Sequence, residues 1–182
     1  MTQRISTRIV AQAILTVDRM DLRAREALAD EIHAHQPTLL ASVLVLPRLG
    51  ARLEQVEIIL NILFVVYQAM KISGHAWPMV CEDLQDRCLD RLVAKMLFLD
   101  GLTTLQQAQA LQQQIDSHAE PNLLAFVYSR LQDHDLLDVK TDAIKFMLLA
   151  AVNLTECVAA VCPSHTTKAV QRRTARRVKT AA

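Results

Sequence analysis

The chain has little glycine, proline or aromatic character: three glycines, five prolines and 4% aromatic residues in 182 positions. A β-rich fold of this length needs many more turn residues, so the scarcity argues against one and favours helices joined by short connections. Because 52% of the residues are nonetheless hydrophobic, the apolar mass consists of Leu, Ile, Val, Ala and Met, the residues that fill helix interfaces. We therefore predict an all-α fold.

Glycine is also too sparse for the common phosphate-binding loops. With glycine only at positions 50, 74 and 101, neither a G-x-x-x-x-G-K-[ST] loop nor a G-x-G-x-x-G loop is present. The G-x-S-x-G elbow of α/β-hydrolases is missing as well. These absences argue against nucleotide chemistry and acyl transfer by these routes, and we predict no catalytic residues and no cofactor.

The cysteines lack the spacing of a metal or redox motif. Cys81 and Cys88 are seven residues apart, Cys157 and Cys162 are five apart, and no C-x-x-C pair occurs. A four-thiolate zinc site normally takes two tight pairs from turns. We interpret the cysteines as buried free thiols, which favours a reducing, cytoplasmic location.

The histidines do not complete a metal site either. His33 and His35 are two residues apart, which places them on different sides of a helix, whereas metal pairs on helices are three or four residues apart. His118 has the place of His35 in the repeat described next. We expect such a histidine at a helix C-terminus, where its partial charge suits the helix dipole, and predict no metal.

The two halves of the chain match each other at a shift of about 83 residues. Arg8–Ala11 (RIVA) meets Arg91–Ala94 (RLVA), and Pro37–Ala41 and Pro121–Ala125 both read P-x-L-L-A after one inserted residue. We interpret this as a tandem duplication of a four-helix unit, although amphipathic helices can also match by pattern alone.

The repeat sets the predicted domain organisation. We predict one all-α domain of about eight helices over residues 1–163, made of pseudo-repeats 1–75 and 79–163, and a basic, disordered tail over 164–182. A short α-solenoid is the alternative architecture, since 83 residues is about two repeats of the HEAT length.

Each half ends in its most apolar helix, Val56–Met70 in the first and Ala143–Cys162 in the second. A helix that is apolar nearly all round must lie inside its bundle, so we expect these two helices to pack together at the core. Polar residues interrupt their apolar stretches before the roughly 20 residues needed to cross a bilayer. We therefore predict no membrane span.

Asn61 and Asn153 interrupt these two helices. Burying an unpaired amide costs about 1–3 kcal/mol, so we expect both to be hydrogen-bonded. The bond would either cross the core and fix the helix register or belong to a ligand pocket. A carboxylate cluster for cations or acid/base work is a weaker hypothesis, because acidic residues are expected at helix starts in any case; its candidate members are Glu54, Glu57, Asp138 and Asp142.

Positive charge is concentrated at the C-terminal end. The formal net charge is +1, yet residues 163–182 carry six of the 20 basic side chains and no acid, so the other 14 and the 19 acidic residues leave about −5 on the remainder. We expect a solvated tail, with nucleic acid, an acidic protein or a membrane surface as alternative contacts. The candidate polyanion-binding residues are Lys168, Arg172, Arg173, Arg176, Arg177 and Lys179.

Taken together, these features predict a non-enzymatic cytoplasmic interaction or adaptor protein. Its partner would be another protein or a second copy, held in a groove between the two halves. The first alternative is a nucleic-acid-associated accessory factor that uses the basic tail. The second is a ligand-binding helical bundle or an enzyme that works around Asn61, Asn153 and the acidic residues at the helix starts.

Overall fold

The structure is a computed structural model that describes residues 5–99 and 104–161. Within these ranges the regular elements are all helical and no strand occurs, which confirms the predicted all-α fold. In chain order they are α1 (Thr7–Asp18), α2 (Leu22–His35), α3 (Pro37–Leu44), the short 3₁₀ helix η1 (Leu46–Leu49), α4 (Leu53–Ile72), α5 (Glu82–Leu99), α6 (Thr104–Ser117), α7 (Pro121–Asp133) and α8 (Asp142–Val161).

The helix boundaries follow local signals in the sequence. Asp21 caps α2, because its Oδ1 accepts the backbone N–H of Ala24 at 2.8 Å. Pro37 and Pro121 stand in the first turns of α3 and α7, where a helix has no use for the missing N–H. Gly50 ends η1 with a φ of 92°, a left-handed conformation that suits glycine.

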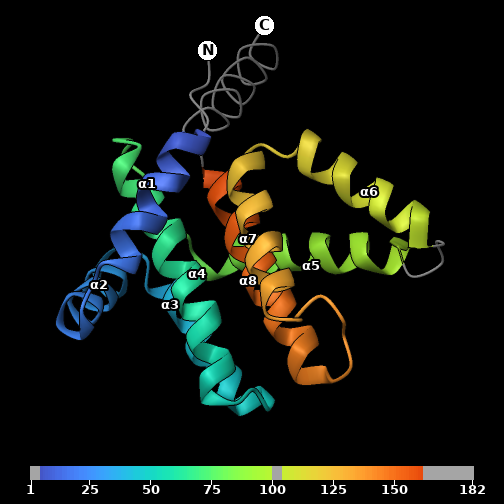
Figure 1. Cartoon of the computed structure of the whole chain (residues 1–182), viewed down its shortest axis with the longest axis horizontal. Helices are drawn as coiled ribbons and strands as arrows, with labels where there is room; N and C mark the ends of the chain where they lie inside the picture. Colours follow the sequence, from blue (N-terminus) through green and yellow to red (C-terminus); the bar gives the residue numbers. More distant parts are fainter. Residues whose placement is uncertain (1–4, 100–103, 162–182) are drawn as a thin grey trace, which may run out of the picture.

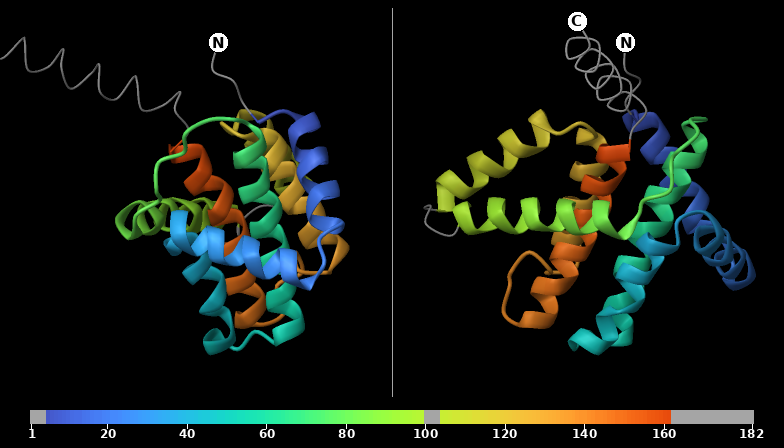
Figure 2. Two further views of the ribbon diagram at one scale, coloured as in Figure 1. Left: turned by 90° about the vertical axis from the view of Figure 1, so that its left-hand side faces the viewer. Right: turned by 180° about the vertical axis from the view of Figure 1, so that it is seen from behind.

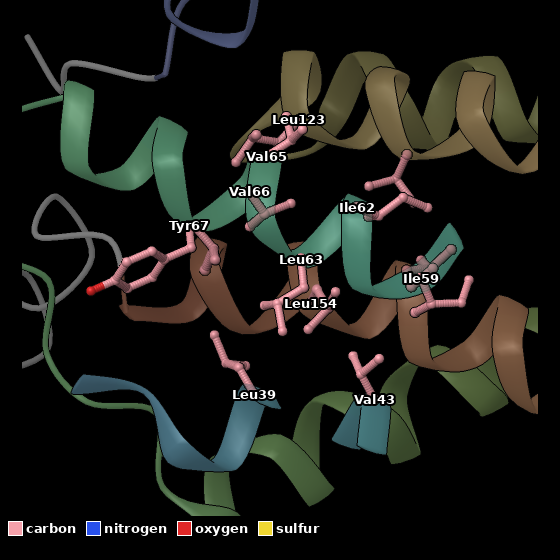
Figure 3. Packing of buried hydrophobic residues seen from close by; sticks show 14 of the residues in the cluster. Leu39, Val43, Ile59, Ile62, Leu63, Val65, Val66, Tyr67, Leu123 and Leu154 are labelled. Atoms are coloured by element: carbon pink, nitrogen blue, oxygen red, sulfur yellow. The ribbon is translucent and has the colours of Figure 1, made fainter. Parts of the chain in front are cut away.

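The two most apolar helices, α4 and α8, pack against each other at the centre of the bundle, as predicted (Figure 1). Figure 3 shows Leu63 of α4 close to Leu154 of α8, with Leu39 and Val43 of α3 below them. All four side chains are buried. Helix α1 packs on α4 and α7 packs on α8, so the apolar faces of both central helices are covered.

Helices α4 and α8 are long and apolar enough to cross a membrane by length and composition alone. Of the most apolar part of each helix, 56% in α4 and 67% in α8 is buried inside the bundle, and core helices commonly meet the same criterion. The absence of a membrane span therefore stays a prediction.

Helices α5 and α6 form an arm that projects sideways from the bundle (Figures 1 and 2). Within the described residues, α5 packs on α8 and α6 packs on α7. The figures show α5 running out sideways from its crossing with α8, whereas α1 stays against the bundle, where it packs on α4. The two halves thus share the order of their four main helices but not the packing of the first, and the tandem duplication stays a prediction.

Candidate functional site

The structure places the predicted polar core residues apart from each other. Asn153 is buried on α8, and its Nδ2 donates to the backbone oxygen of Gln85 on α5 at 3.3 Å. Its Oδ1 is buried without a hydrogen-bond partner. Asn61 is half-buried on α4. The hydrogen bond expected for Asn153 therefore joins α8 to α5, and its partner is not Asn61.

The ligand-pocket and metal alternatives gain no support from the described residues. A surface hollow lies on α6, is lined by side chains such as Gln109, Gln112 and Asp116, and includes neither asparagine. No group of three or more His, Cys, Asp or Glu side chains in the described ranges could hold a metal ion. Asp138 forms an exposed ion pair with Lys140 at 2.8 Å.

The predicted polyanion-binding residues lie outside the described part of the chain. They are Lys168, Arg172, Arg173, Arg176, Arg177 and Lys179. The role of the tail therefore stays a prediction.

A polar cluster lies where α5 crosses α8, and we call it the crossing cluster. Helix α5 supplies three of its members at positions i, i+3 and i+7, which lie on one helix face. Helix α8 supplies two consecutive residues, and the last member follows α6 directly. The crossing cluster consists of Cys88, Arg91, Lys95, His118, Glu156 and Cys157.

Glu156 is the electrostatic centre of the crossing cluster. Its Oε1 accepts a hydrogen bond from Lys95 Nζ at 2.7 Å, and its Oε2 lies 3.7 Å from His118 Nε2. Burial alone would raise the pKa of the carboxyl group, but the contacts with His118 and Lys95 outweigh burial and lower the pKa to about 2. Burial and the Glu156 charge together raise the pKa of the nearby Tyr128 to about 12.

His118 is held in one orientation by its own chain. Its Nδ1 accepts the backbone N–H of Glu120 at 3.1 Å, so in the neutral ring the proton is on Nε2, the atom that faces Glu156. At 3.7 Å that approach is too long for an ordinary hydrogen bond and acts as an electrostatic contact. His118 does follow a helix, as predicted, but it is buried against a carboxylate. His35 lies at the C-terminal end of α2, as expected, where it is exposed and its Nδ1 contacts the backbone oxygen of Glu31 at 2.9 Å.

The two cysteines of the crossing cluster are fully buried free thiols, as predicted. The prediction is wrong for Cys81, which is exposed because it stands just before α5 and not on its buried face, and Cys162 lies outside the described residues. The two helices pack against each other there, and the two thiols are near enough to affect each other's ionisation. Arg91 Nη2 lies 3.0 Å from Cys88 Sγ. The Cys157 hydrogen bond and Arg91 outweigh burial and hold the pKa of Cys88 below its usual range, whereas the hydrogen bond to Cys88 and burial raise the pKa of Cys157.

Sequence reasoning missed this pairing although one signal was available. Cys88, Arg91 and Lys95 share a face of a helix that the apolar pattern already predicts. Their partners on α8 lie more than 60 residues further along the chain. Only the crossing of α5 and α8 brings the two sets together.

A second feature is an apolar surface at the end of the bundle where η1 meets the start of α8, and we call it the end surface. Large apolar side chains are exposed on the segments that meet there, most strongly Leu53 at 77%. Helix η1 packs against α3, α4 and α8, and a Cβ built on Gly50 would lie 3.8 Å from Ala143 Cβ. The end surface consists of Leu44, Val45, Leu49, Leu53, Val139 and Phe146.

Comparisons with protein-family models, with curated proteins and with solved structures found no match for this chain.

Proposed function

We propose that this chain is a helical protein-interaction or adaptor protein that associates through its end surface. The observation that supports this is the exposure of several large apolar side chains on neighbouring segments, with Leu53 and Leu44 the most exposed among them. Contiguous exposed apolar surface is costly in water and marks interaction sites in soluble proteins. The end surface replaces the groove between the halves that the sequence suggested. Cytoplasmic location remains part of the proposal.

The partner that we propose is a second copy of the chain. Exposed charges of both signs stand on the same segments as the apolar residues: Arg48 and Arg52 beside Glu54, and Lys145 beside Asp142. In a two-fold contact each surface meets its own copy, so basic residues of one protomer can face acidic residues of the other around an apolar centre. Such a mixed rim suits self-association better than binding to a partner of one charge sign.

The experiment is sedimentation equilibrium over a range of concentrations, with the native chain and a Leu49→Ser/Leu53→Ser variant. We expect the native chain to dimerise and the variant to associate at least about tenfold more weakly, because each Leu buried in an interface contributes about 1.5–3 kcal/mol. Leu22→Ser is the matched control, since Leu22 is 74% exposed but lies on α2. A native chain that stays monomeric, or a control that weakens association equally, would contradict the proposal.

The basic tail supports a second candidate, a nucleic-acid-associated accessory factor. Six basic and no acidic residues in 163–182 would give a salt slope near −5 if each contacted one phosphate, at about −0.9 per contact. Deleting residues 164–182 tests this by a nucleic-acid binding titration at several salt concentrations. Binding that survives the deletion would rule out the tail as the binding element.

A further inference from the structure

We propose that Cys88 and Cys157 form a reversible dithiol–disulfide site that is oxidised by a hydroperoxide, with Cys88 as the thiol that reacts first. This goes beyond the interaction function and does not depend on it. The inference rests on the burial of the two thiols where two helices pack together and on the guanidinium group held at one of them.

The geometry needs little change to form the disulfide. Both cysteines are fully buried where α5 packs on α8, and neighbouring residues of the two helices are joined by the Asn153–Gln85 hydrogen bond and the Lys95–Glu156 ion pair. A disulfide requires a sulfur–sulfur distance of about 2.05 Å with Cβ atoms about 3.5–4.5 Å apart. Because the two side chains are buried at the same helix crossing, we expect the disulfide to form by movement of these side chains within the crossing.

The surroundings make the two thiols unequal. Arg91 donates to Cys88 Sγ, and a cation at this distance stabilises a thiolate, which is the nucleophilic form. At Cys157 the hydrogen bond to Cys88, burial and the negative charge of Glu156 all oppose ionisation of the thiol, and together they outweigh the smaller effect of Arg91. Cys88 is thus the attacking sulfur and Cys157 the one that resolves the product.

Access to the buried sulfur is through Arg91. The Arg91 side chain is exposed, yet its Nη2 contacts Cys88 Sγ, so the sulfur lies one side chain below the surface. Rotation of Arg91 therefore opens a path for a molecule as small as hydrogen peroxide. The arm also has fewer packing partners than the bundle, and sparsely packed elements open locally at low free-energy cost.

The reaction balances with the peroxide as oxidant. The Cys88 thiolate attacks one peroxide oxygen, the O–O bond breaks, and Cys88 becomes a sulfenic acid while hydroxide leaves and is protonated to water. The Cys157 sulfur then attacks the sulfenic sulfur, the S–O bond breaks, and the Cys157 proton leaves with the oxygen as a second water. Two thiols and one hydrogen peroxide give one disulfide and two waters. An external dithiol reverses the change by exchange.

The consequence for the fold is a covalent link between the arm and the central helix. In the reduced protein α5 is held on α8 by packing, by the Lys95–Glu156 ion pair and by the Asn153 hydrogen bond. The disulfide would fix the crossing point and suppress opening of the arm. The dithiol site would thus react with a small hydroperoxide, and its oxidation would lower the mobility of α5 and α6.

The experiment uses the full chain with Cys81→Ser and Cys162→Ser, so that only the proposed pair remains, and the unchanged chain in parallel. Circular dichroism first checks that the variant is folded. Each protein receives one equivalent of hydrogen peroxide, and peptide mass mapping follows after the remaining thiols are alkylated. We expect a Cys88–Cys157 linked peptide, a mass loss of two hydrogen atoms, and recovery of both thiols with dithiothreitol.

Matched variants assign the roles. Arg91→Ala should slow disulfide formation by about tenfold or more, because it lowers the thiolate fraction of Cys88. Arg87→Ala is the control, an exposed arginine one turn earlier on the same helix, and it should react at the native rate. In Cys157→Ser, a sulfenic-acid trap such as dimedone should label Cys88, whereas in Cys88→Ser it should leave Cys157 unlabelled.

Three results would overturn the proposal. The folded chain could leave both thiols unreacted at peroxide concentrations that oxidise the urea-unfolded chain. Arg91→Ala could react as fast as Arg87→Ala. Finally, Cys88 could pass to sulfinic acid with Cys157 still reduced, which would show that the pair does not resolve.

Discussion

Helices α1 and α5 open the two halves of the chain, and they pack in different ways. Helix α1 buries Val10, Ala13 and Val17 against the bundle, a continuous apolar stripe that lies on α4. Helix α5 buries Cys88 and Leu92, and Leu97 further along it remains 67% exposed. Helix α1 stays against the bundle and buries a whole stripe, whereas α5 projects from the bundle and buries only the part near its crossing with α8.

The contact of α1 with α4 mainly stabilises the fold, whereas the crossing of α5 and α8 carries the reactive side chains. The contact between α1 and α4 is apolar, so it contributes free energy of folding but few reactive groups. The crossing of α5 and α8 includes thiols, a guanidinium group and a carboxylate. We therefore expect substitutions in the bundle to change stability strongly and substitutions on the arm to change it weakly, with the crossing cluster between them.

The largest expected effect is in the central helix. Leu63→Ala on α4 removes a fully buried side chain and should lower the free energy of unfolding by about 2–5 kcal/mol through lost burial and a cavity. Leu97→Ala on the exposed part of α5 should change it by less than about 0.5 kcal/mol. Urea denaturation of both variants checks the contrast. Equal losses would show that the arm packs as the bundle does.

The second-largest effect is expected where the bundle meets the segment that leads into α5. Gln36 is buried; its Nε2 donates to Pro78 O at 3.0 Å, and its Oε1 accepts from Val80 N at 2.8 Å. Gln36→Ala would leave the buried Val80 N–H unpaired and should cost about 1–3 kcal/mol. Gln113→Ala, at an exposed position on α6, is the control and should be near neutral. Hydrogen exchange at Val80 should accelerate in the first variant and stay unchanged in the second.

The smallest effect is expected at the crossing cluster and depends on pH. The pKa of Glu156 is lowered from an ordinary value of 4.5 to about 2, so its stabilisation is present above pH 4.5 and is lost as the pH falls towards 2. Because Lys95 is partly solvent-exposed, we expect the Glu156 carboxylate to contribute only about 1–2 kcal/mol to the free energy of unfolding at neutral pH. Glu156→Gln should be less stable than the native chain at pH 7.

The pH dependence supplies the control within the same pair of proteins. The difference between native chain and Glu156→Gln, measured by urea denaturation, should shrink steadily below pH 4.5. Glu26→Gln replaces an exposed glutamate on α2, and its stability difference from the native chain should change much less with pH. A difference that stays constant from pH 7 to pH 2.5 would mean that the carboxylate charge is not what stabilises the crossing.

Much of the fold could be predicted because its signals are local. Asp21, Pro37 and Pro121 mark helix starts through their own hydrogen-bonding chemistry. Because the residues of α4 and α8 are apolar on nearly all sides of each helix, the sequence predicted that both helices are central. The projecting arm could not be predicted, since Val93 and Leu97 continue an apolar pattern like that of α1 and give no sign that α5 leaves the bundle.

The candidate site was predictable only in its separate parts. Burial of Cys88 and Cys157 followed from their apolar helical surroundings, and it is confirmed. Their contact did not follow, because it joins residues of two helices far apart in the chain. The burial of His118 against Glu156 was missed for the same reason, because the position of His118 at a helix end indicated only an interaction with the helix terminus.

By itself the sequence determined where the helices begin and end and which two are the most apolar, because caps, prolines and hydrophobic periodicity act over a few neighbouring residues. Only the tertiary structure decided that α5 crosses α8 and places Arg91 on the sulfur of Cys88 opposite Cys157. The physical reason is that the crossing depends on how whole helix surfaces fit together. Residues distant in the chain contribute to that fit, and no local pattern records it.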